Sequence, residues 1–256
     1  EGRVAPTAMV TAIGCDAGGW WRVLGVGVVD TESYDSWLAF LRRVRDRGVA
    51  GVQLAVSDAH PGLVRALGEV FQGASWQRRR VHFMRDCMRE AGSWHPRRRV
   101  GRILSPVFRG RDAATVTAMC HVAIDMPGTC CPRAAAILEE AEPDALAYLD
   151  FPPSHRRRLR TSSVQERNNR EIKRRSRMVQ VFPSVKSLAR LAGAVMCEQD
   201  EMWQGSRYFS EAKMDEPCDD KRIHGIDGPV DWARLEVDAR KMIESSLELA
   251  DRVEAA

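Results

Sequence analysis

Two acidic residues far apart in the chain, Asp58 and Glu166, have the chemistry of metal ligands. Asp58 directly follows residues 51–57, an apolar run that predicts a short buried strand. A carboxylate at the end of a strand can hold a divalent metal ion, but Asp is also a favoured cap for a helix that follows. The position of Asp58 is therefore compatible with both roles.

Glu166 lies in a strongly basic stretch, residues 160–183, that predicts one helix. The hydroxyl residues at 161–163 can cap its start, and Pro183 cannot continue it. At about 100° per residue, one face carries a carboxylate with amide and basic side chains: Glu166, Asn169, Arg170, Lys173 and, at its edge, Arg174. Such a face can hold a metal ion and lie along phosphates, or it can be a solvated, salt-bridged surface.

Basic residues are distributed unevenly along the 256-residue chain. The 39 Lys and Arg exceed the 35 Asp and Glu by only four, but arginines cluster at 78–80, 97–99, 156–160 and 167–177. Local basic surfaces of this kind indicate a polyanionic partner more strongly than the net charge does. The chain is long enough to form one large or two modest domains with a buried core.

The seven cysteines follow neither a disulfide nor a zinc pattern. Their number is odd and no Cys-x-x-Cys pair occurs, which fits a reduced cytosol better than a disulfide framework. The Cys120-His121 pair and residues 130–131 have the wrong spacing for a common zinc site. The N-terminal residues lack a signal-peptide pattern and resemble the middle of a longer protein. No apolar run approaches the roughly 20 residues of a membrane span.

The first third of the chain predicts a mixed α/β sheet. Two β runs joined by a Gly-rich turn predict a hairpin, after which helices and strands alternate. The expected elements are strands at 4–14 and 20–29, a helix at 30–47, a strand at 51–57, a helix at 59–73 and a strand at 76–83. Among the aromatic residues, Trp20, Trp21, Trp76 and Trp203 are expected to belong to the core rather than to stack on bases.

The rest of the chain predicts helices only. Residues 84–150 show helical apolar spacing and no convincing β run, which indicates a helical insertion ending at the Phe-Pro-Pro of 151–153. Beyond the basic helix, we expect helices at 184–203 and 232–253, separated by a polar linker at 217–229. The last amphipathic helix can pack back on the domain or pair with another protomer.

Several segments resemble, in the correct order, the bacterial Mutator-type insertion-sequence transposases. They are Val-Ser-Asp-Ala-His-Pro-Gly-Leu at 56–63 and the segments 71–85, 160–183, 193–199 and 207–211. The resemblance runs from about residue 3 to about residue 214. It implies an α/β fold: a ribonuclease-H-like mixed sheet with an all-helical insertion and C-terminal helices. The implied parts are 3–83 (without the first catalytic strand), the insertion 84–153, the part 154–214 with the catalytic Glu helix, and 215–256, a linker with an amphipathic tail helix.

The resemblance also implies a DNA transposase of the DDE type, which cuts and joins DNA with an Asp-Asp-Glu triad and two Mg²⁺ ions. By motif, Asp58 matches the second Asp and Glu166 the Glu, so both are expected to be catalytic residues and metal ligands. Two metal ions can activate a water or a DNA 3′-hydroxyl and stabilise the leaving oxygen. The expected DNA contacts are Arg167, Asn169, Arg170, Lys173 and Arg174. The expected partners are insertion-sequence ends, target DNA and further copies of the chain, in the bacterial cytoplasm at the nucleoid and without a membrane.

Two features depart from the family pattern. The family's first Asp lies on a strand before the hairpin, and neither Asp16 nor Asp30 is in register to replace it. Relatives usually carry a Cys-x-x-His pair after the second Asp. Here His82 is present but Arg79 stands at the Cys position, so we expect His82 to be a packed strand residue. With one acid and the terminal-repeat-binding region absent, the chain as it stands is expected not to cleave or join DNA. Magnesium-dependent strand transfer would refute this.

Three hypotheses from different classes follow from the sequence. The first is a DNA-transposing nuclease, represented by a fragment of its catalytic domain. The second is a non-catalytic remnant that binds DNA or dimerises. The third is an α/β protein with a helical insertion whose basic helix is only a solvated surface. A salt-dependent gel shift on DNA separates the second from the third.

Overall fold

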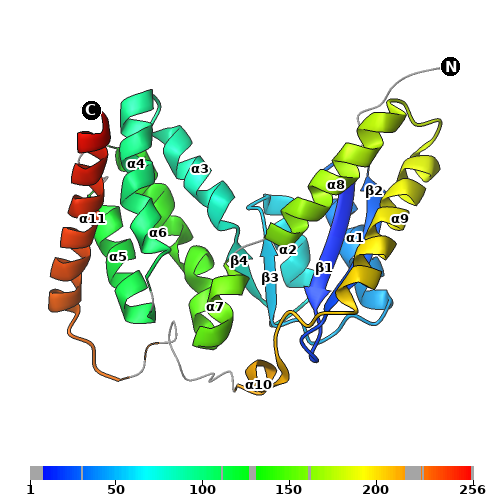
Figure 1. Cartoon of the computed structure of the whole chain (residues 1–256), viewed down its shortest axis with the longest axis horizontal. Helices are drawn as coiled ribbons and strands as arrows, with labels where there is room; N and C mark the ends of the chain where they lie inside the picture. The colour runs from blue at the N-terminus through cyan, green and yellow to red at the C-terminus, as the bar shows by residue number, and fades with distance from the viewer. Residues whose placement is uncertain are drawn as a thin grey trace. The chain divides into compact units, whose positions relative to one another are not determined.

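The computed structural model describes residues 8–29, 31–110, 112–126, 131–160, 163–216, 226 and 228–254 (Figure 1). The chain divides into two compact units, each described by itself. The hairpin unit comprises Glu1–Ala55, Ala59–Ser75 and Thr161–Pro217, and the helical unit comprises Val56–Asp58, Trp76–Arg160 and Cys218–Ala256. Thr161 and Ser162, two of the three predicted caps of the basic helix, lie outside the described residues, as does most of the predicted linker at 217–229.

The hairpin unit is built around two antiparallel strands. Its elements are β1 (Ala8–Cys15), β2 (Trp21–Val29), α1 (Tyr34–Asp46), α2 (Pro61–Val70), α8 (Ser163–Val179), α9 (Val185–Trp203) and α10 (Glu211–Met214). The pairing runs from Ala8 opposite Val29 to Cys15 opposite Trp21, with an irregularity between Ala12 and Ile13. The predicted hairpin is confirmed, as are the helices predicted at 30–47 and 184–203 apart from shifts at their ends.

Both faces of the hairpin are covered by helices because successive side chains of a strand point to opposite sides. Val10 and Val29 pack against α1 and α2 in one core cluster, which includes Phe40. Met9 and Ile13 pack against a second cluster formed by residues of α8 and α9. Figure 1 shows these two helices beside the hairpin. The hairpin therefore determines how the basic helix α8 is placed within this unit.

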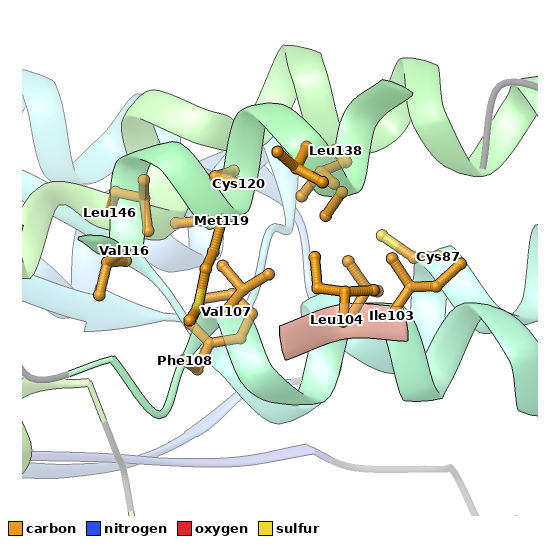
Figure 2. Close-up of a cluster of buried hydrophobic side chains, with 14 of the residues drawn as sticks. Cys87, Ile103, Leu104, Val107, Phe108, Val116, Met119, Cys120, Leu138 and Leu146 are labelled. Carbon is orange, nitrogen blue, oxygen red and sulfur yellow. The ribbon is translucent and has the colours of Figure 1, made fainter. Parts of the chain in front are cut away.

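The helical unit has its own core. Its elements are α3 (Arg80–Glu90), α4 (Trp94–Val107), α5 (Ala113–Asp125), α6 (Pro132–Leu146), a 3₁₀ turn (Ala147–Asp150), α7 (Pro153–Leu159) and α11 (Trp232–Glu254). Figure 2 shows buried side chains of this core, among them Leu104, Val107 and Leu138. The last helix packs back onto α4 and α5 and contributes Ala239, Ile243 and Leu247 to the core, which answers one question that the sequence left open.

A second two-stranded sheet pairs β3 (Leu54–Ser57) with β4 (Ser75–Arg78). The amide of Ser75 donates to the Gln53 carbonyl at 2.9 Å, and the amide of Arg79 donates to the Ser57 carbonyl at 2.9 Å. Because residue numbers rise together along both segments, the two strands run parallel. The mixed α/β class is confirmed. The expected single mixed sheet is not, because the described strands form two separate sheets of two strands each.

The predicted strand at 76–83 is wrong in its second half. The strand ends at Arg78, and helix α3 begins at Arg80, so His82 lies in the first turn of a helix rather than in a strand. Phe83 and Cys87 are buried one helical turn apart, and this packing favours the helix over the strand. The four tryptophans predicted as core residues, Trp20, Trp21, Trp76 and Trp203, are only partly buried. No helix among the described residues is long and apolar enough to cross a membrane.

Gly19 lies in the turn of the first hairpin, and its position predicts that a substitution there destabilises the fold. Its φ is +81°, and a Cβ there would clash with the carbonyl oxygen of Phe209. The Gly19 carbonyl accepts hydrogen bonds from the amides of Tyr208 at 2.8 Å and Phe209 at 3.1 Å. Gly19→Ala is expected to lower the free energy of unfolding by about 2–4 kcal/mol, measured by urea denaturation, because left-handed backbone strain and overpacking act together.

Gly73→Ala is the control, since Gly73 also has a positive φ (+85°) but no atom lies within 4 Å of the position that its Cβ would take. Equal losses in the two variants would contradict the steric part of this prediction.

Candidate functional site

Asp58 follows β3 and contacts an arginine and a histidine of the helical unit. Its Oδ1 lies 3.0 Å from Arg79 Nη1 and 3.4 Å from His82 Nδ1. Asp58 does not cap the following helix, because the Nδ1 atom of His60 takes that role and accepts from the Leu63 amide at 3.3 Å. Of the two roles that the sequence allowed, capping is therefore excluded. The side chain of Asp58 is 41% exposed, but its Oδ1 atom is buried.

Two residues that follow β4, Arg79 and His82, both contact Asp58. Arg79, only 12% exposed, directly follows β4, and His82, 36% exposed, lies in the first turn of α3. Sequence reasoning missed this contact, because the pairing of β3 with β4 that brings Arg79 to Asp58 leaves no local signal in the sequence. Arg79 thus places a positive charge beside Asp58.

Helix α8 is fixed to β1 through one polar face. Gln165 Nε2 donates to the hydroxyl of Thr11 and to its carbonyl oxygen, the latter at 3.2 Å, and the Thr11 hydroxyl donates to Asn169 Oδ1 at 3.3 Å. Ile172 is buried on the same side. Asn169, predicted to contact DNA, is therefore engaged with the hairpin.

An ionic network ties α8 to α9. The Oε1 atom of Glu171 lies 2.8 Å from Arg174 Nη2 and 2.8 Å from Arg175 Nε. The Nη2 atom of Arg175 also lies 2.6 Å from Glu198 Oε2. Hydrogen bonds from Arg174 and Arg175 lower the pKa of Glu171 to about 2, so this carboxylate stays ionised at neutral pH. Arg174, another predicted DNA contact, is thus held by an acidic neighbour on its own helix.

The other predicted DNA contacts lie on the outward side of α8. Arg167, Arg170 and Lys173 are exposed, and none of them forms an ion pair with any residue in the described part of the chain. Glu166, in the first turn of α8, is partly buried. Three cationic side chains on a helix whose opposite face is fixed form a surface that can contact successive phosphates.

Asp58 and Glu166 belong to different units, so their joint action stays a prediction. Carboxylate oxygens are suitable ligands for Mg²⁺. The described residues contain no group of three or more His, Cys, Asp and Glu side chains that could hold a metal ion. The carboxylates of Asp58 and Glu166 are therefore suitable ligands for Mg²⁺, but the described residues do not bring together a complete set of ligands.

Comparison with known proteins identifies relatives across most of the chain. A family model described as "Transposase, Mutator family" matches residues 1–206. The chain is 37% identical over 213 residues to the transposase for insertion sequence element IS1081 of Mycobacterium tuberculosis, covering 81% of this chain and 50% of that protein. It is 33% identical over 209 residues to the transposase for IS406 of Burkholderia multivorans, covering 82% and 54%, and 33% identical over 208 residues to the transposase for IS256 in transposon Tn4001 of Staphylococcus aureus, covering 79% and 52%. The chain spans about half the length of the curated relatives it matches.

Proposed function

Because this chain belongs to the Mutator family of transposases, we propose that it acts on DNA in the transposition of an insertion sequence. The observation that carries this proposal is the match of residues 1–206 to the family, together with relatives that are named transposases for insertion sequences. The proposed substrates are the ends of the element and a target duplex. The proposed assembly is a homo-oligomer on DNA, at the nucleoid of a bacterial cytoplasm.

The outward face of α8 is the proposed DNA-contacting surface. Arg167, Arg170 and Lys173 project from a helix that Gln165 and Ile172 hold against the hairpin. Because that helix is already held in place, its cationic side chains can bind a phosphate backbone with little further loss of conformational entropy. Binding through such contacts tolerates many sequences and weakens steeply as salt is added.

The proposed chemistry is the metal-assisted cleavage and joining of phosphodiester bonds by a DDE-type transposase with a ribonuclease-H-like fold. Asp58 and Glu166 would supply two of the carboxylates that bind Mg²⁺, and the bound metal would polarise the scissile phosphate and its nucleophile. Within the chain, Arg79 and His82 orient the Asp58 carboxylate by their contacts at 3.0 Å and 3.4 Å. No covalent enzyme intermediate is required.

A second candidate is DNA binding without catalysis. It is favoured by the guanidinium of Arg79, which lies 3.0 Å from Asp58 and offsets its negative charge. In this case the chain would occupy DNA or pair with a complete relative without cutting.

An excision assay separates the two candidates. Bacterial cells carry a marked insertion sequence of the family on a plasmid, with and without expression of this chain, and loss of the element is counted by restored marker function. Excision above the background supports the transposase. Salt-dependent DNA binding by the purified chain without excision supports the second candidate, and the absence of both would refute the two proposals together.

A further inference from the structure

Three arginines from separate parts of the helical unit gather around Phe108. The Cζ of Arg80, at the start of α3, lies 6.0 Å from the centre of the Phe108 ring. Arg160, which ends α7, donates through Nη1 to the carbonyl oxygen of Phe108, and Arg109 is the next residue in the chain. Phe108 is only 2% exposed, so Arg80 and Arg160 converge on a buried residue. We call Arg80, Arg109 and Arg160 the Phe108 arginine cluster.

Carboxylates neutralise the two arginines next to Arg80 but not Arg80 itself. Arg78 lies 3.5 Å from Asp144, and Arg79 lies 3.0 Å from Asp58. Among the described residues, Arg80 has no ion pair, and the charges of Arg160 and Arg109 both act on it. Burial, followed by repulsion from these two arginines, lowers the pKa of Arg80. The positive charge of the cluster is thus left without a negative partner in the described structure.

Polar atoms inside the cluster also lack partners. The Nε atoms of Arg80 and Arg160 are buried and form no hydrogen bond with the described residues. The hydroxyl of Tyr148, a residue 2% exposed, lies beside Arg160, and burial raises the pKa of this phenol. Tyr148 therefore stays neutral and can donate a hydrogen bond, but it supplies no negative charge.

We propose that the Phe108 arginine cluster binds a phosphate group. Like charges that are partly withdrawn from water repel one another, and buried N–H donors without acceptors are destabilising. A phosphate would supply both negative charge and several acceptors, and guanidinium groups suit it because they donate two parallel hydrogen bonds. Arg109 is exposed and its charge acts on Arg80, so we expect a phosphate to approach the cluster from the side of Arg109.

The phosphate can come from a DNA backbone or from free inorganic phosphate. A DNA phosphate as the occupant rests on the proposed function, whereas binding of free phosphate does not. The cluster lies in the helical unit and the α8 face lies in the hairpin unit, so the two surfaces can be tested by separate substitutions.

The test measures thermal unfolding of the full chain in sodium phosphate and in sodium chloride of equal ionic strength. The wild type is expected to melt at a temperature higher by roughly 3 °C or more in phosphate, because a ligand bound only to the folded state stabilises it. Arg80→Gln is expected to melt at or above the wild-type temperature in chloride, since it removes repulsion, and to lose most of the rise in phosphate. Arg109→Gln, at an exposed position, is expected to keep the chloride value and weaken the phosphate response.

Arg157→Gln, an exposed arginine on α7 outside the cluster, is the matched control and should respond to phosphate as the wild type does. An equal phosphate response in the wild type and in Arg80→Gln would overturn the proposal. So would Arg80→Gln melting several degrees lower in chloride, because that result assigns Arg80 a purely structural role.

A second measurement identifies the source of the phosphate. Fluorescence anisotropy with a labelled 20-base-pair duplex is recorded for the wild type and for Arg80→Gln. A loss of about tenfold in DNA affinity, roughly the contribution of one charged contact, supports a DNA phosphate. Unchanged DNA affinity together with phosphate protection supports a site for free phosphate. Phosphate protection in a chain that binds no DNA would sustain this inference and refute the proposed function.

Discussion

Asp58→Asn is expected to reduce excision of the insertion sequence by about 10³-fold or more, if the chain excises the element as proposed. The substitution keeps the size of the side chain and an oxygen that can accept from Arg79, but it removes the negative charge that would bind Mg²⁺. Loss of a catalytic metal removes several kcal/mol of transition-state stabilisation, and each 1.4 kcal/mol corresponds to about a factor of ten. The measurement is the excision frequency in the plasmid assay, with Glu166→Gln expected to give a loss of the same size.

Two carboxylates serve as matched controls for these substitutions. Asp144 lies 3.5 Å from Arg78 in the helical unit, so Asp144→Asn also takes a carboxylate from an arginine of the 78–80 run. Glu171→Gln changes a glutamate on the same helix as Glu166 and disturbs only the network with Arg174 and Arg175. Both controls are expected to keep excision within about threefold of the wild type. Excision by Asp58→Asn above a tenth of the wild-type frequency would show that this carboxylate does not bind a catalytic metal.

The stability of Asp58→Asn must be measured beside its activity. Arg79 is 12% exposed and would lose a charged partner that is itself 41% exposed, which costs about 1 kcal/mol. Urea denaturation of the wild type, Asp58→Asn and Asp144→Asn reports this loss. A folded Asp58→Asn protein without excision separates the chemical role of the carboxylate from its structural role.

The spacing of apolar residues predicted those helices and strands in which a single helical or strand periodicity continues along the whole segment. The hairpin and the helices α1, α9 and α11 have such patterns, and they were found close to the predicted positions. The segment after Trp76 was mispredicted because its arginines carry no periodic signal. The strand extends only to Arg78, and the side chain of the buried Gln77 donates to the Ala145 carbonyl at 2.9 Å and accepts from the Tyr148 amide at 2.8 Å. Those partners are about seventy residues away, so no local pattern could identify them.

The sequence predicted the two acidic residues of the candidate site, but it did not predict the side chains that surround them. The strand end before Asp58 and the helix that carries Glu166 were both found where they were expected. The contact of Arg79 with Asp58 depends on the pairing of β3 with β4, which the sequence does not specify. Asn169 was placed on the DNA-contacting face by helical angle alone, whereas its hydrogen bond to Thr11 draws it toward β1.

Replacing Arg167, Arg170 and Lys173 together by Ala is expected to weaken DNA binding by about a hundredfold at 0.1 M salt. These three exposed side chains form no ion pair with described residues, so they can meet phosphates without first breaking an internal contact. If each neutralises one phosphate, the slope of log affinity against log salt becomes shallower by roughly 0.9 per residue, or about 2.7 in total. Fluorescence anisotropy with a labelled duplex at several sodium chloride concentrations measures both quantities.

A second triple substitution separates a local contact from a general effect of charge. Arg234, Arg240 and Lys241 are exposed on α11, and replacing them by Ala lowers the net charge of the chain from +4 to +1, as the α8 substitution does. If DNA lies along α8, the α11 variant keeps the wild-type salt slope and the α8 variant does not. Equal slopes in the two variants would mean that only overall charge attracts the duplex. The outward face of α8 would then be a solvated surface, and Glu166 would have no neighbouring phosphate on which to act.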